Sequence, residues 1–542
     1  MGFPHDENPS RIKIYEETIQ KLNPGEFYQY LGVPVGNKND QNPTELLNNV
    51  LRATKAISNS GLQQHQKIKA IQTVIFPKLI FAFRTREISR TTLQVPYTES
   101  TKIRGNLSNK LRIILREILC LPPQAETAYL YTDTADGGAG LRDLFDEYNL
   151  QQIVQGFKLL NCKDPEVAMV MRKSLYLASE VRVGNPLLKR IEALHWINGF
   201  QEPLNNGKAA KSWWMRIRRA FQRFSTEHNT HFSLEEDGGY FNLRITDAAG
   251  ITTVANRDNV HNITEVLHSA IHKGYQVKWK NSKLSNLLCE QLAARAWTNK
   301  LIYSGLIGPL GWNFIHKARS NSLSINAHPK NALSTLRTCR RCHGPNETMT
   351  HVLQSCKLNM TLVNDRHNAC LNLIFNAVKN DRLIVAMNNT IQFIKDDSET
   401  SRQRIDLYIE DVYKKSIILA DLKCPIDMPA TMNGADPRNI AKYAELKTKV
   451  QKAKPGNTVT LLTIVVGSLG CVPEETRKVL KKIGISNSRL KGLQEDLSIT
   501  NIRHSARIWH MHRSGELVNP EQGFERSTFY KTEYSLSAME NQ

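Results

Sequence analysis

The sequence lacks any run of about 18 apolar residues, the length that a membrane-spanning helix needs, so no such helix is predicted. Its first residues lack the basic and apolar regions of a secretory signal. Cysteine is scarce, with nine in 542 residues, and the number is odd. A secreted disulfide framework is therefore not expected, and the cysteines indicate a reducing compartment. The chain also lacks internal repeats and low-complexity segments.

Acidic residues are also fewer than basic ones. Lys and Arg total 72 against 51 Asp and Glu, which gives a formal net charge of +21 and a pI near 9.5. The excess is spread along the chain rather than held in one tail. Because neutralised phosphates provide most nonspecific nucleic-acid affinity, we expect a polyanionic partner. The alternative is a basic protein whose charge serves no such partner.

Helical periodicity dominates the first two thirds of the chain. Apolar residues recur at helical spacing over 45–75, and we expect Pro77 to kink or end that helix. A second helix is expected over 102–119, where Lys and Arg surround an apolar stripe, and more helix over 141–200. Residues 230–282 are more strand-like.

The stretch 208–224 mixes cations with aromatic residues. If it is helical, Arg216, Arg219 and Arg223 share one face. Cations beside aromatic rings suit contact with a nucleic-acid backbone together with base stacking. In the alternative interpretation the aromatic residues are core and the cations form a solvated face.

The most specific motif is a C-x2-C-x8-H-x4-C pattern, formed by Cys339, Cys342, His351 and Cys356. A tight turn would hold the first two thiolates, and a following helical turn would supply His351 and Cys356. Four such ligands are typical of a closed structural zinc site. His343 is the poorer ligand because it directly abuts Cys342. Buried cysteines without a metal are the alternative. Arg340 and Arg341, inside the first turn, make this knuckle a candidate nucleic-acid reader.

A second constellation lies in 404–423, which alternates like a β-hairpin. Asp421 and Lys423 share a face of the second strand, and pairing across the hairpin brings Asp406 near Asp421. Two carboxylates on one face are costly without a partner charge, which Mg²⁺ would supply. Lys423 could then orient the attacking water. The pattern is short, so a solvated charged hairpin is the alternative.

The residues after this hairpin complete a small α/β unit. Asp436-Pro437 predicts a helix start, and the helix carries Lys442. Residues 458–466 read as a buried strand. The order strand, strand, helix, strand suits a restriction-endonuclease-like core.

Taken together, the chain resembles the C-terminal part of site-specific non-LTR retrotransposon polyproteins, which carry a restriction-like endonuclease after the reverse transcriptase. The similar segments are Tyr30-Leu31-Gly32-Val33 (palm edge), residues 40–130 (thumb), Gly137-Gly138-Ala139-Gly140-Leu141 (GG-x-G turn), Cys339, Cys342, His351 and Cys356 (zinc knuckle), Arg366-His367-Asn368 (conserved triplet), Asp406 and Asp421 (nuclease acids), and Lys442-Tyr443 (nuclease helix). The resemblance implies nucleic-acid contacts at Arg366 and His367, and catalytic roles for Asp406, Asp421, Lys423 and Lys442.

Three departures from the family pattern stand out. Ile405 replaces the usual Pro before the first Asp, and Asn439 stands where an additional Lys is common. No Tyr/Phe-x-Asp-Asp motif of a polymerase palm occurs, so we do not expect this chain alone to polymerise DNA. An upstream palm in a longer reverse transcriptase is the alternative.

The resemblance implies a protein that binds element RNA and duplex target DNA. It would nick the DNA with Mg²⁺ to prime reverse transcription, in the nucleus and also as a cytoplasmic ribonucleoprotein. A non-catalytic or decayed nucleic-acid-binding fragment is the alternative.

We therefore expect a multidomain α+β protein of helical thumb and linker, zinc knuckle and α/β nuclease. The expected parts are a palm remnant (1–36), a thumb-like domain (37–135), a linker (136–335), the knuckle (336–375), the endonuclease (385–510) and a flexible tail (511–542).

Overall fold

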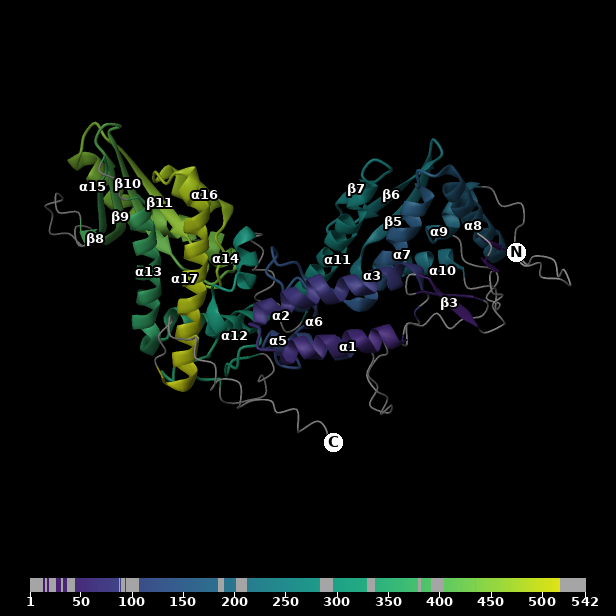
Figure 1. Ribbon diagram of the computed structural model, residues 1–542. Coiled ribbons are helices and arrows are strands. Elements are labelled where there is room, and N and C mark those ends of the chain that lie inside the picture. The colour runs from purple at the N-terminus through teal and green to yellow at the C-terminus, as the bar shows by residue number, and fades with distance from the viewer. Residues whose placement is uncertain are drawn as a thin grey trace.

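The computed structural model describes a mainly helical protein of mixed α/β class. Figure 1 shows α1–α11 with the β5–β7 sheet on one side, and a four-stranded sheet with α13 and α15–α17 on the other. The structure describes residues 13–14, 17–18, 26–30, 33–36, 44–86, 88, 93, 107–183, 190–200, 212–282, 296–328, 337–378, 382–390, 404–433 and 435–516.

The N-terminal helices bear out most of the helical periodicity. The expected helix over 45–75 is divided into α1 and α2, followed by one π-helical turn, and Pro77 then stands in the first turn of α3. Residues 64–85 form one continuous helical run, so Pro77 does not end the helix, and the π turn lies directly before α3. The bounds are β1 Lys13–Ile14, β2 Glu17–Thr18, β3 Phe27–Tyr30, β4 Val33–Gly36, α1 Thr44–Asn59, α2 Gln64–Ala70, π turn Ile71–Ile75, α3 Phe76–Thr85 and α5 Leu107–Ile118.

Residues 230–282, for which strands are predicted, form strands only in their first half. Strands β5–β7 form an antiparallel sheet, but the residues after them form helix α11. Ile263, Leu267 and Ile271 are buried at helical spacing. The strand propensity of single residues does not reveal this spacing. The bounds are α6 Thr127–Tyr131, α7 Leu144–Leu160, α8 Pro165–Val183, α9 Arg190–Ile197, α10 Trp213–His228, β5 His231–Asp237, β6 Tyr240–Thr246, β7 Thr252–Ala255 and α11 Ile263–Lys280.

One apolar core runs from Leu47 to Trp509 and joins the two halves of the chain. Helix α12 (Gly308–Arg319) is the link, because its Arg319 is fully buried and donates to the Leu469 carbonyl at 2.8 Å. The N–H of Leu469 in turn donates to Asp427 at 2.7 Å. The C-terminal region is therefore continuous in packing with the helical region before it.

The four-stranded sheet has the order β11-β10-β9-β8. Strands β8, β9 and β10 pair antiparallel, and the crossover helix α15 returns the chain so that β11 pairs parallel with β10. The expected hairpin, helix and strand are thereby confirmed, but β11 lies at the edge of the sheet and is only partly buried. The bounds are α13 Met360–Val378, β8 Ile384–Thr390, β9 Arg404–Asp411, β10 Ser416–Lys423, α14 Pro429–Asn433, α15 Ala435–Ala453, β11 Thr458–Val465, α16 Glu474–Lys482 and α17 Asn487–Ser514.

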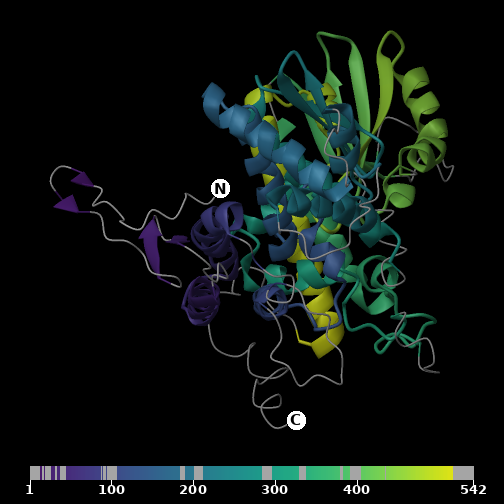
Figure 2. The same ribbon diagram turned by 90° about the vertical axis from the view of Figure 1, so that its right-hand side faces the viewer.

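Each face of this sheet has its own apolar core. Tyr443, Leu446 and Val450 of α15 cover one face, and Figure 2 shows that helix lying along the outside of the sheet. Helices α13, α16 and α17 cover the other face. Alternating side chains of β9 therefore serve two cores, which fixes the register.

The expected tail boundary is corrected. Helix α17 continues unbroken through residue 511 to Ser514, and His512 is buried. The rest of the expected tail, 517–542, lies outside the described residues.

Candidate functional site

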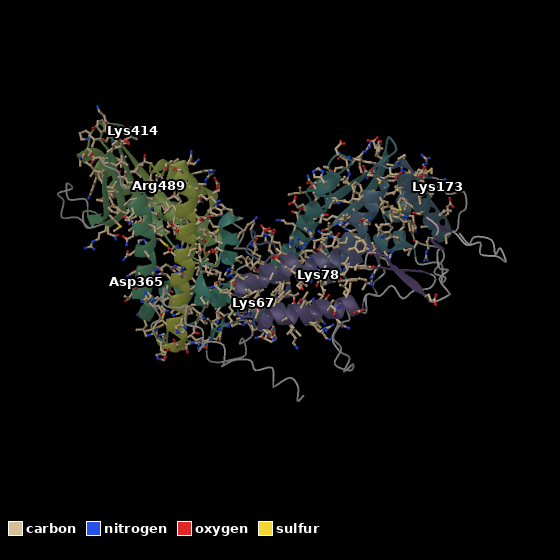
Figure 3. All side chains as sticks on the ribbon, in the orientation of Figure 1. Lys67, Lys78, Lys173, Asp365, Lys414 and Arg489 are labelled. Atoms are coloured by element: carbon tan, nitrogen blue, oxygen red, sulfur yellow. The ribbon has the colours of Figure 1, made fainter. Side chains whose placement is uncertain are left out.

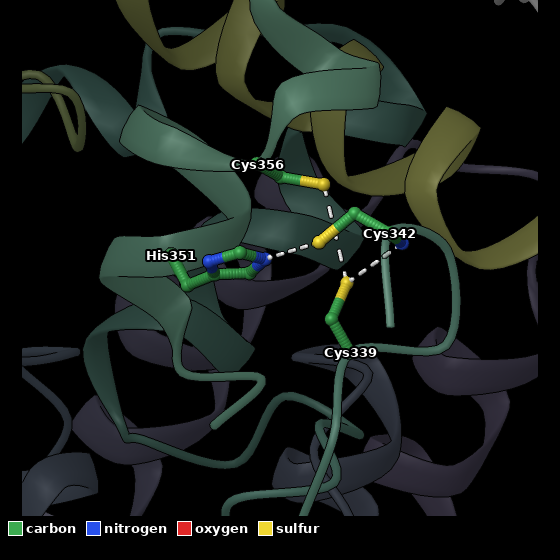
Figure 4. A group of neighbouring side chains, drawn as sticks. All are labelled: Cys339, Cys342, His351 and Cys356. Atoms are coloured by element: carbon green, nitrogen blue, oxygen red, sulfur yellow. Dashed lines mark hydrogen bonds between the residues drawn. The ribbon is translucent and has the colours of Figure 1, made fainter. Parts of the chain in front are cut away.

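The cysteine cluster assembles as its spacing predicts. The candidate ligand atoms of Cys339, Cys342, His351 and Cys356 all lie within 4.8 Å of one another. Figure 4 shows the three sulfurs and the imidazole converging from a loop and a helical turn. This set could hold a metal ion, and three thiolates with one imidazole are typical of closed tetrahedral zinc sites.

Local backbone bonds explain why this loop holds its shape. The Cys339 N–H donates to the Gly344 carbonyl at 2.9 Å, and the His343 N–H donates back to Cys339 at 3.0 Å. The Cys342 N–H points to the Cys339 sulfur at 3.5 Å. His343 is exposed at φ 55° and is outside the set of close ligands, as expected. Cys356 ends the π turn His351–Ser355 that precedes α13.

The two arginines of the knuckle are half-buried and bond neighbouring parts of the protein. Arg340 pairs with the fully buried Glu347 at 2.7 Å and donates to the Ser324 carbonyl at 2.8 Å. Arg341 donates to Asn359 at 3.4 Å. Both side chains fasten the knuckle, which is a role that the C-R-R-C motif does not reveal.

Of the expected triplet, Arg366 must be corrected. Its side chain is 1% exposed and donates to Ser505 Oγ at 3.0 Å and to the Leu353 carbonyl at 3.1 Å. Arg366 therefore cannot reach a nucleic acid, and it instead joins the knuckle to α17.

His367 lies beside one of the candidate nuclease acids, and its side chain is 25% exposed. Its Nε2 lies 3.2 Å from Asp406 Oδ2 and 3.2 Å from the Leu422 carbonyl. Burial alone would lower the pKa of His367, but the hydrogen bond and charge of Asp406 raise it to about 9. The imidazole is thus a cation beside a candidate catalytic acid.

The two candidate acids lie at the same end of the sheet. The antiparallel register ends at Ala420 and Leu407, and the two acids are the next residues beyond that pair, Asp421 on β10 and Asp406 on β9. Asp421 is 1% exposed, and burial followed by the negative charge of Asp406 raises its pKa. Asp406 Oδ2 also accepts the Leu422 N–H at 2.7 Å. Two carboxylates are therefore held together despite their repulsion.

Two lysines and a tyrosine complete this site. Lys423 forms an ion pair with Asp421 Oδ2. The Tyr443 hydroxyl donates to Asp421 Oδ1 at 2.9 Å, and Lys442 Nζ lies 2.7 Å from that hydroxyl. Burial and the charge of Asp421 raise the pKa of Tyr443, which keeps it a neutral donor. Lys442 thus reaches the acids through Tyr443, a link that the sequence does not show.

Ile405 and Asn439, which depart from the pattern of the resemblance, both lie on the side of the sheet that α15 covers. Ile405 is fully buried in the core under α15. Asn439 is 1% exposed and donates to Thr463 Oγ1 at 2.9 Å, which ties α15 to β11. Both residues are structural here.

Arg216, Arg219 and Arg223 do fall on a helix, α10, but they differ in exposure. Arg219 is exposed and Arg216 is half-buried. Arg223 is bound to Asp146 at 3.0 Å and stacks over the Phe145 ring at 4.3 Å. Arg219 is the most accessible of the three to a polyanion.

No family model matches the chain, and a search of curated proteins finds no similar entry. Within the described residues no helix is long and apolar enough to span a membrane.

Proposed function

We propose that this protein is a Mg²⁺-dependent endonuclease that nicks duplex DNA, with a zinc knuckle and a basic nucleic-acid-binding scaffold. The observation that carries the proposal is the meeting of Asp406, Asp421 and Lys423 at one end of a mixed four-stranded sheet. The same end receives Lys442 and His367 from two helices.

The donor set fits a divalent cation. Asp406 and Asp421 would hold it, because both offer carboxylate oxygens, the ligands that Mg²⁺ prefers. The raised pKa of Asp421 supports this, since a cation would relieve the repulsion between the two acids. A bound Mg²⁺ would lower the pKa of an attacking water and offset charge on the phosphate.

The remaining side chains would act around that centre. Lys423, whose side chain is 38% exposed, can leave Asp421 and reach a phosphate. Lys442, held through Tyr443, suits a grip on the DNA backbone. His367 is a positioning residue that holds Asp406 through Oδ2.

The resemblance to non-LTR retrotransposon proteins supports duplex target DNA and element RNA as partners, and target-primed reverse transcription in the nucleus as the setting. A second candidate is a non-catalytic nucleic-acid-binding module. Ile405 and Asn439 in place of the usual Pro and Lys favour it.

Nicking of supercoiled plasmid with Mg²⁺ tests the first candidate. We expect Asp406→Ala and Asp421→Ala to abolish nicking while DNA binding is kept, and Lys423→Ala and Lys442→Ala to reduce it by about 10²-fold or more. Lys414→Ala, at the exposed tip of the same hairpin, is the matched control and should nick like the parent. Parental activity of Asp421→Ala would refute the assignment, and an inactive parent that still binds DNA would favour the second candidate.

A further inference from the structure

The metal cluster contacts the far end of the chain. His512 stands in the last turn of α17 and is 1% exposed. Its Nε2 lies 3.8 Å from the Cys339 sulfur and 3.4 Å from the Glu347 carboxylate. The C-x2-C pattern contains no hint of this contact, because 173 residues separate the two side chains.

Hydrogen bonds decide which nitrogen of His512 carries the proton. The Asn359 amide donates to His512 Nδ1 at 3.0 Å. The orientation of that amide is set by the Val352 carbonyl, which accepts from Asn359 Nδ2 at 2.9 Å, and by Arg341, which donates to Oδ1. Because Nδ1 accepts, the neutral ring carries its hydrogen on Nε2. That N–H faces both the Glu347 carboxylate and the Cys339 sulfur, so the two acceptors share it.

We propose that His512 donates a hydrogen bond to the metal-bound thiolate of Cys339, so that metal binding at the knuckle and docking of the end of α17 stabilise each other. Three thiolates and a neutral imidazole around Zn²⁺ leave one excess negative charge. Cys339 is fully buried, so that charge needs protein donors rather than water. Outer hydrogen bonds of this kind change metal affinity by about 10–100-fold.

Two further contacts hold the same turn of α17 against the knuckle. Arg341 Nη1 donates to the Met511 carbonyl at 3.3 Å, so an arginine between the two first cysteines grips the turn that carries His512. Glu347, which approaches the same nitrogen of His512 as Cys339 does, is fixed by Arg340. The knuckle loop and the helix end are therefore one bonded unit rather than neighbouring surfaces.

The coupling extends toward the candidate nuclease site. Helix α13 follows Cys356 by a single 3₁₀ turn and packs along α17. His367, which meets Asp406, lies on α13. The coupling between the knuckle and α17 does not depend on nuclease activity of the sheet.

Zinc release from the full-length, zinc-loaded chain tests the inference. We expect His512→Ala to lose zinc to a coloured chelator about 10–100-fold faster than the parent. His512→Gln, whose amide nitrogen can replace Nε2 as donor, should restore most of the difference. The matched control is His504→Ala, two turns earlier on the same helix, which should release zinc like the parent.

A second readout needs no substitution and reports on α17 directly. Hydrogen exchange of residues 505–514 in the parent should be slow with zinc and faster after chelation, while the β9–β10 hairpin is unchanged. Parental zinc release by His512→Ala would overturn the proposal. So would equal protection of 505–514 with and without zinc, or a parent that binds no zinc.

Discussion

At Arg366 and Arg219 the same side chain serves two physical roles. Arg366 is 1% exposed and bonded to two elements, whereas Arg219 projects from α10 into solvent. A buried guanidinium contributes to stability through the acceptors that it satisfies. An exposed one contributes to association with a polyanion.

We therefore predict opposite effects for two substitutions. Arg366→Ala should lower the free energy of unfolding by about 3 kcal/mol, because it leaves a cavity and unpaired acceptors. Arg219→Ala should leave that free energy within about 0.5 kcal/mol of the parent and weaken RNA or DNA binding. Urea denaturation and a binding titration on both variants measure this. Equal stability of the two variants would contradict the assignment.

Residue types and spacing predicted the ligands of the cluster and the pairing of Asp406 with Asp421. They did not predict that His367 meets Asp406 or that His512 meets Cys339. The first set is joined by local turns and a hairpin, whose geometry follows from short-range rules. The second set depends on how helices far apart in the chain pack together, and that packing leaves no periodic pattern in the sequence.

At the scale of elements, Asp146 in the first turn of α7 fastens that helix to α10 and α11. His228 and Arg223 of α10 each lie 3.0 Å from it. Tyr275 of α11 also donates to it. The side chain of Asp146 is nearly fully buried, so these three partners replace the water that it loses.

Because Asp146 is bonded in this way, its contribution to the free energy of unfolding should depend on pH. Burial alone would raise the pKa of Asp146, but His228, Arg223 and Tyr275 lower it well below its usual range. A depressed carboxyl pKa stabilises the folded state above the unfolded value of about 4, and that stabilisation is lost as the pH falls. Asp146→Asn should therefore cost on the order of 2 kcal/mol at pH 7 and progressively less below about pH 4. Urea unfolding across this range measures it, and a pH-independent difference would argue against it.

Some helices and strands can be predicted from their local sequence, and others cannot. The alternation of the β9 and β10 residues identified those two strands, because it is a local pattern. Asp436-Pro437 marked the start of α15 closely, but the helix begins at Ala435, so Asp436 lies in its first turn and is not its cap. Residues 263–280 belong to the stretch for which the sequence predicts strands, yet they fold as α11. A Cβ added at its Gly274 would lie 2.5 Å from His228 Cβ, so glycine allows α11 to pack closely against α10.

At the scale of the whole molecule, the excess of 21 positive charges is not confined to one part of the fold. Figure 3 shows labelled lysines and an arginine on both sides, and Lys78, Lys173, Lys414 and Arg489 among them are exposed. Helix α16 brings a denser group close to the candidate nuclease site. Its Thr476 bonds the Val465 carbonyl, and Val465 pairs with Lys423 in the sheet.

That placement leads to a prediction about salt. Lysines that neutralise phosphates release counterions, so the logarithm of the DNA-binding constant should fall linearly with the logarithm of salt concentration. Each phosphate contact contributes about 0.9 to the slope, and several contacts should give a slope of roughly −5 or steeper. Replacing the exposed Lys481 and Lys482 of α16 by Ala together should make the slope shallower by about 2, with stability unchanged. Lys173→Ala, on α8, is the control and should keep the parental slope with the same duplex. A parental slope in the double variant would place the DNA elsewhere than beside α16, and a flat titration of the parent would remove the electrostatic basis for a nucleic-acid partner altogether.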